Sequence, residues 1–201
     1  MKKIVLIFSV VALVASAGII ACNSSEKDSA NKEGIVDTPS EGERIERGKY
    51  LVTIMGCNDC HTPKKMGPQG PELDSNLLLS GHPASMPVAK PNPAMLKDFV
   101  GFTHTLTATV GPWGTSYAAN ITSDETGIGN WTEEQFFTAI RNGKFKGAPA
   151  GRNLLPPMPW QMYSHATDED LKSIFAYLKS TKPVKNLVPS PIPPDQSAAA
   201  K

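Results

Sequence analysis

The sequence predicts a mainly α fold with a long, loop-rich insertion. Three segments, residues 44–55, 132–143 and 167–182, carry apolar residues at helical spacing or residues that cap helices. Residues 62–130 are rich in proline and glycine, which prevents long helices there. At 201 residues, the chain is long enough for one domain with a hydrophobic core.

The first 21 residues are predicted to be the signal peptide of a bacterial lipoprotein. Two lysines precede an apolar run, and small residues precede Cys22. The apolar run is barely long enough to span a bilayer, which disfavours a retained transmembrane helix. The ending IIAC resembles the lipobox, after which cleavage leaves the cysteine as the first, lipid-carrying residue. We therefore expect a lipid anchor at Cys22.

Residues 22–43 are expected to form a flexible tether, because a polar stretch of this kind cannot bury enough surface to fold. Loss of two signal-peptide lysines lowers the basic count from 20 to 18, against 19 acidic residues. This balance excludes a broad basic surface for nucleic acid. Asn23 is not the aspartate that retains lipoproteins on the inner membrane in enterobacterial-type sorting. The expected address is the periplasmic side of a membrane, with the outer membrane slightly favoured.

The predicted elements of the domain begin with a helix over residues 44–55. In the insertion, FTHTLTATV, residues 102–110, alternates threonines with Phe, His, Leu, Ala and Val, which is typical of a strand with one buried face. A small β-hairpin is therefore expected there.

Two further helices are expected after the insertion. In the first, Thr132 and Gln135 can form a capping box and Gly143 can close the end. In the second, Thr167 can cap the first turn, and an apolar stripe follows at Leu171, Ile174, Phe175 and Leu178. The Pro-rich tail, residues 184–201, is expected to be extended and largely disordered.

CNDCH, residues 57–61, is the attachment signature of a c-type haem. Cys57 and Cys60 can reach both vinyl groups of one haem, and the adjacent His61 can then bind the iron as its proximal ligand. A thioredoxin-type redox pair belongs at a strand-to-helix junction, whereas this motif follows a helix. A structural zinc site would need a second pair of ligands, and no second cysteine pair exists.

The sixth iron ligand is open among several methionines and histidines. The candidates are Met66, Met86, Met95, Met158, Met162, His82, His104 and His165. Met158 is preferred because Pro157 and Pro159 restrict its loop, so that less entropy is lost when its sulfur is presented to iron. Met162, without such flanking prolines, is the second choice. A thioether opposite histidine favours electron transfer over oxygen chemistry.

The order of these elements resembles a class I c-type cytochrome. More narrowly, RGKYLVTIMGCNDCHTP, GPWGTSYAANITSDETGIGNWTEEQFFTAIRNGK and LLPPMPWQMYSHATDEDLKSIFAYLKS resemble the haem domains of bacterial periplasmic cytochromes, including cytochrome subunits of alcohol and sugar-acid dehydrogenases. The resemblance implies a cytochrome c fold over residues 44–183, with helices around one covalently bound haem. It makes Cys57 and Cys60 the thioether attachments, His61 the proximal ligand and Met158 the distal ligand.

The resemblance also implies that the first and last helices cross. Gly48 would allow a close approach there, and Tyr177 or Leu178 would fill the contact. Near the distal ligand, Trp160 is a candidate for the haem pocket, and Arg152 is expected to be solvated rather than paired with a haem propionate.

The chain has one C-x-x-C-H motif, where the multi-haem dehydrogenase subunits carry three. We therefore expect a lipid-anchored electron carrier with a single haem c, rather than an enzyme. Its partners would be a dehydrogenase, another cytochrome or an oxidase. Two alternatives are a catalytic or gas-binding haem protein with a displaceable Met158, and a fixed electron-transfer module of a dehydrogenase complex.

Overall fold

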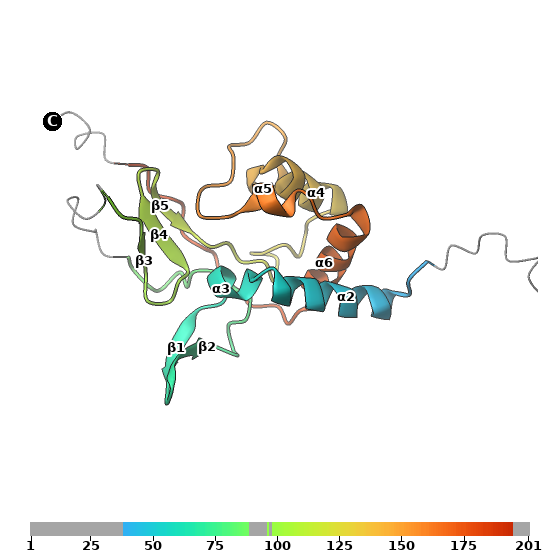
Figure 1. Cartoon of the computed structure of the whole chain (residues 1–201), viewed down its shortest axis with the longest axis horizontal. Coiled ribbons are helices and arrows are strands. Elements are labelled where there is room, and N and C mark those ends of the chain that lie inside the picture. Colours follow the sequence, from blue (N-terminus) through green and yellow to red (C-terminus); the bar gives the residue numbers. More distant parts are fainter. Residues whose placement is uncertain (1–37, 89–95, 97, 195–201) are drawn as a thin grey trace, which may run out of the picture. The chain divides into compact units, whose positions relative to one another are not determined.

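The computed structural model describes residues 38–88, 96 and 98–194. In chain order (Figure 1) the elements are α2 (Glu41–Ile54), α3 (Cys57–His61), β1 (Lys64–Gly67), β2 (Gly70–Leu73), β3 (Gly101–Phe102), β4 (Ala108–Gly111), β5 (Gly114–Tyr117), α4 (Glu133–Asn142), the 3₁₀ helix η2 (Phe145–Gly147), α5 (Trp160–Tyr163) and α6 (Asp168–Ser180). The predicted signal peptide, Cys22 and Met95 lie outside the described residues. In the part that is described, no helix is long and apolar enough to cross a bilayer.

Helix α2 begins at Glu41, three residues before the predicted start, so residues 41–43 belong to a helix and not to a tether. The cause is a capping box: the Ser40 side chain accepts from the Glu43 amide, and the Glu43 carboxylate accepts from the Ser40 amide. This reciprocal pair satisfies two amides that the helix itself leaves free.

The expected crossing of the first and last helices is confirmed for α2 and α6. A Cβ placed on Gly48 would lie 1.9 Å from the Ser173 carbonyl oxygen and 2.7 Å from the Tyr177 Cβ. Glycine is therefore required at this point, because any side chain would push the two helix backbones apart.

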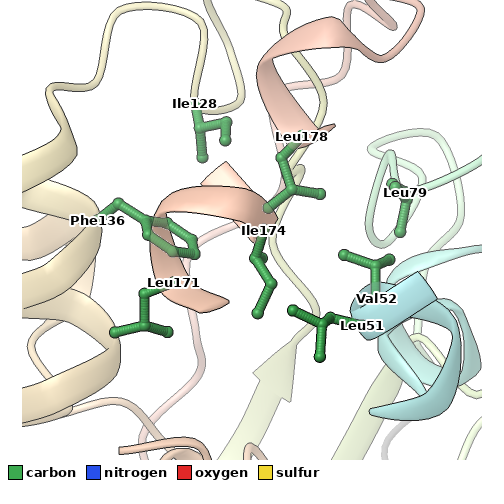
Figure 2. Close-up of a cluster of buried hydrophobic side chains, with 8 residues drawn as sticks. All are labelled: Leu51, Val52, Leu79, Ile128, Phe136, Leu171, Ile174 and Leu178. Carbon is green, nitrogen blue, oxygen red and sulfur yellow. The ribbon is translucent and has the colours of Figure 1, made fainter. Parts of the chain in front are cut away.

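The hydrophobic core joins α2, α4 and α6 with two loops of the insertion (Figure 2). Its buried members are Leu51, Val52, Leu79, Ile128, Phe136, Leu171, Ile174 and Leu178. Cys57 is half-buried against this cluster. The core therefore supports the start of α3.

The predicted start and end of α4 and the predicted start of α6 are confirmed, whereas α6 ends at Ser180, two residues before the predicted end. Thr132 and Gln135 form the capping box of α4, and Gly143 ends the helix in the left-handed conformation, with φ 62°. The Thr167 side chain accepts from the Asp170 amide at the start of α6.

The insertion contains more β structure than the sequence indicates, in two antiparallel sheets. Strands β1 and β2 pair with each other, which was not predicted, and β4 pairs with both β3 and β5. The predicted hairpin is confirmed as β4 and β5, joined at Gly111 and Gly114.

The expected single strand over residues 102–110 is wrong. A turn interrupts it, in which the Leu106 amide donates to the Thr103 carbonyl and Leu106 adopts φ 59°. The buried face carries Thr105 and Thr107, whereas Leu106 is 41% exposed. Burial of the threonines is tolerated because their hydroxyls hydrogen-bond each other, at 2.9 Å.

The first part of the predicted disordered tail, residues 184–194, is hydrogen-bonded to the domain. Asn186 donates from its side chain to the Ser80 and His82 carbonyls at 2.7 and 2.9 Å. Ile192 pairs with Thr115 at the outer edge of β5. These contacts replace water at the polar backbone groups, so this segment is extended but fixed.

Candidate haem-attachment site

The CNDCH motif forms the short helix α3 directly after the end of α2. Gly56, at its N-cap, has φ 68°, a left-handed conformation that lets the chain turn between the two helices. Cys57 and Cys60 are three residues apart, so their side chains share one face of the turn. Neither cysteine forms a disulfide, and both are partly buried. Both thiols are therefore available for a covalent attachment.

His61 has one ring nitrogen fixed and one available. Its Nδ1 lies 2.7 Å from the Ala119 carbonyl oxygen, which can only accept, so Nδ1 carries the proton. The Nε2 lone pair is then free for a metal. Burial is the main cause that lowers the pKa of His61, which favours the neutral imidazole that iron requires.

The carbonyl groups at the C-terminal end of α3 accept hydrogen bonds from Lys64, which follows the helix. The Lys64 ammonium donates to the carbonyls of Asn58 and Thr62 at 3.0 and 2.9 Å, and also to the Asp59 carbonyl. A cation at the C-terminus of a helix is favourable because the helix dipole is negative there. Lys64 therefore fixes the turn that carries the cysteines and His61.

The thiols do not have the properties of a reactive redox pair. Burial raises the pKa of Cys57 to about 11 and also raises the pKa of Cys60. Nucleophilic cysteines of the thioredoxin type have a lowered pKa instead. The described residues also contain no group of three or more His, Cys, Asp or Glu that could hold a metal ion. The groups present, two thiols that could attach a haem covalently and one imidazole nitrogen that could bind its iron, fit a c-type haem.

The loop of Met158 is anchored on both sides. Two residues before it, the Pro156 carbonyl accepts from the Ser116 hydroxyl at 2.6 Å. Five residues after it, the Tyr163 hydroxyl donates to the Met55 carbonyl at 2.6 Å, at the end of α2. Burial is the main cause that raises the pKa of Tyr163 to about 12, so this hydroxyl keeps its proton.

Met158 is half-buried and lines a hollow of about 220 Å³. The hollow is lined by Leu154, Pro156, Pro157, Met158, Pro159, Trp160 and Gln161. The Trp160 ring packs on Gly143 at the end of α4, where an added Cβ would lie 2.3 Å from the ring. Trp160 thus lies in the wall of this hollow beside Met158, and its place in a haem pocket stays a prediction.

One short stretch of chain contacts both predicted ligand segments. Ser116 in β5 binds the Met158 loop, and Ala119, three residues later, binds the His61 ring. At roughly 3.3 Å per extended residue, these two anchor points are at most about 10 Å apart. The CNDCH helix and the Met158 loop are therefore both hydrogen-bonded to the short segment of residues 116–119.

The other ligand candidates are less suitable. His82 is fully buried with both ring nitrogens engaged, by Thr107 Oγ1 at 2.9 Å and by the Met86 carbonyl at 2.8 Å. The Met86 sulfur is the acceptor of a hydrogen bond from Thr105 Oγ1 at 3.9 Å. The remaining candidates within the described residues are exposed, with Met66 at 77% and Met162 at 71%, together with His104 and His165.

Three residues that shape the site were missed by the sequence analysis. The Ala119 carbonyl has no sequence signal, because any residue could supply it. Tyr163 could not be assigned either, since its partner Met55 is 108 residues away. Lys64 did have a signal: a cation directly after a helix can bind the helix's free carbonyls.

No known protein-family model matches the chain. It is 34% identical over 158 residues to the fructose dehydrogenase cytochrome subunit of Gluconobacter japonicus, an alignment that covers 77% of this chain and 25% of that protein. Identity to the gluconate 2-dehydrogenase cytochrome c subunit of Pantoea cypripedii is 28% over 144 residues, covering 71% of this chain and 24% of that protein. Identity to the cytochrome c subunit of the quinone alcohol dehydrogenase of Gluconobacter oxydans is 29% over 142 residues, covering 70% of this chain and 22% of that protein.

The chain thus spans about a quarter of the length of these curated relatives. All three relatives are cytochrome subunits of dehydrogenases. Their names support, at a coarse level, a c-type cytochrome family with haem c as its cofactor.

Proposed function

We propose that this protein is a membrane-anchored, monohaem cytochrome c that passes single electrons between redox partners on the periplasmic side of a bacterial membrane. Cys57 and Cys60 would hold the haem, and His61 and Met158 would be the axial ligands. The observation that carries this proposal is the hydrogen bond from His61 Nδ1 to the Ala119 carbonyl, which leaves Nε2 free for iron inside a C-x-x-C-H helix.

Haem c, when bound, supplies reversible one-electron chemistry at iron. The protein's own groups orient and shield it. Ala119 sets the tautomer and direction of the His61 ring, and Lys64 holds the end of the turn that carries this ring. The Met158 loop is fixed by Ser116, which limits the entropy lost when the sulfur binds.

Replacement of the distal ligand tests the ligand assignment. Met158→Ala in the haem-loaded full chain should abolish the ferric thioether charge-transfer band and lower the reduction potential, because a thioether opposite histidine favours ferrous iron. The matched control is Met162→Ala, which removes an exposed methionine four residues away and should leave both properties unchanged. Loss of the band in Met162→Ala alone would refute the assignment. Rapid binding of carbon monoxide by the reduced wild type would instead favour a gas-binding protein.

A fixed electron-transfer module of a dehydrogenase complex is the second candidate function. This candidate is favoured because the relatives are named as subunits of dehydrogenases. Recovery of a dehydrogenase with the tagged, lipidated protein from detergent-solubilised membranes would support it. Recovery of the cytochrome alone would support the mobile carrier.

A further inference from the structure

The chain between Glu134 and Asp168 contains four lysines and arginines and no carboxylate. One of the four, Arg141, forms an ion pair with Asp168 at 2.6 Å. The other three are Lys144, Lys146 and Arg152, and within the described residues none of them belongs to an ion pair. The loop that joins α4 to α5 (Figure 1) therefore carries three uncompensated positive charges.

These three charges are held in a defined arrangement. Lys144 pairs with Asn153 across the base of the loop, and its ammonium donates to the Asn153 side chain at 3.0 Å. The Arg152 guanidinium lies 3.7 Å from the centre of the Phe145 ring, and the Lys146 ammonium lies 5.6 Å from it. We call residues 144–153 the cationic loop. Because its backbone is already closed, little entropy would be lost when it binds a partner.

The cationic loop adjoins the hollow that Met158 lines. The Leu154 amide donates to the Gly143 carbonyl at 2.6 Å and closes the loop, and Leu154 also lines the hollow. Trp160, in the wall of the same hollow, packs on Gly143. The surface thus combines an apolar centre containing a tryptophan with a charged border, which is the composition typical of protein interfaces.

We propose that the cationic loop and the Met158 hollow form the docking surface for an acidic patch on a redox partner protein. This inference rests on the proposed electron-transfer function, since the partner would meet the protein beside the distal ligand. A lipid surface is disfavoured because membrane-binding basic segments carry four to eight cations, and this loop carries three. Charge complementarity of this kind mainly accelerates association and weakens with salt.

The test uses a probe of defined chemistry, a carboxylate-terminated monolayer on gold. The full, haem-loaded chain is compared with the triple variant Lys144→Gln, Lys146→Gln, Arg152→Gln. The matched control is Lys49→Gln, Lys182→Gln, Lys185→Gln, which removes the same charge from exposed positions elsewhere. At low salt the loop variant should bind the monolayer about tenfold more weakly or worse, the control should stay within about twofold of the wild type, and salt near 0.5 M should remove the difference.

Equal losses in both variants would overturn the proposal, since net charge alone would then explain binding. Unchanged binding of the loop variant would also overturn it. The proposal would also be overturned if the loop variant lost binding to phosphatidylglycerol vesicles but still bound the monolayer like the wild type. That result would show that the loop binds lipid. Adsorbed mass and faradaic current are recorded separately. Loop-dependent adsorption without current would refute electron transfer and leave the docking surface standing, whereas current that does not depend on the loop would refute the docking surface alone.

Discussion

The close crossing of α2 and α6 gives a sharp prediction at Gly48. In Gly48→Ala the new methyl group would lie 1.9 Å from the Ser173 carbonyl oxygen. That oxygen would have to retreat by 1.1 Å to reach 3.0 Å, below which real Cβ contacts essentially never fall. The oxygen belongs to the backbone of α6 and cannot rotate away as a side chain can. The two helices must therefore separate.

The expected cost follows from two opposing effects. Overpacking of a well-packed contact costs about 1–3 kcal/mol, and a clash with backbone belongs at the upper end. Alanine regains about 1 kcal/mol through its higher helix propensity. The net loss in the free energy of unfolding is then about 2 kcal/mol, which corresponds to a fall in Tm of roughly 4–8 °C for a domain of this size.

The control is the same substitution on the same helix. A Cβ on Gly42 has no atom within 4 Å, so Gly42→Ala should stabilise the protein, by up to about 1 kcal/mol. Both variants are unfolded in denaturant as haem-loaded full chains and followed by far-UV circular dichroism and by haem absorbance. If Gly48→Ala were as stable as Gly42→Ala, the tight crossing of α2 and α6 would be refuted.

Three further predictions concern the site and its anchor. Tyr163→Phe removes the hydrogen bond to the Met55 carbonyl, so it should cost about 1 kcal/mol of stability and raise the affinity of the ferric protein for imidazole up to about fivefold in an optical titration. Lys64→Gln loses charge-assisted hydrogen bonds to α3 and should lower the free energy of unfolding by about 1–2 kcal/mol. The control Lys65→Gln replaces an exposed neighbour and should change the free energy of unfolding by less than about 1 kcal/mol. Equal effects of the two substitutions would contradict the role of Lys64. Cys22→Ala should move the cytochrome from the membrane to the soluble fraction after cell fractionation, and retention on the membrane would disprove the lipid anchor.

Local chemistry explains which features could be predicted. Thr132, Gln135 and Gly143 define α4 through contacts within a few residues, so the sequence pattern is sufficient there. The same holds for the cap of α6 at Thr167. The start of α2 was missed by three residues because the Ser40 and Glu43 capping box lies in a polar stretch that is typical of a tether.

Long-range contacts explain the failures. The alternation over residues 102–110 indicates an apolar buried face, but Thr105 and Thr107 are buried because their hydroxyls bond each other and His82, 25 residues away. The tail was expected to be free, yet Asn186 reaches carbonyls more than 100 positions earlier in the chain. Neither pairing leaves a periodic signal.

By itself, the sequence determined the chemistry that this protein carries: two cysteines and a histidine in one turn, a methionine between prolines, and the capped helices around them. Only the tertiary structure decided how these groups are presented. It selects the free nitrogen of His61 through Ala119, and it removes His82 from the candidate ligands by occupying both of its nitrogens. The physical reason is that a motif specifies donor atoms locally, whereas the direction and availability of each donor depend on hydrogen-bond partners that only folding brings near.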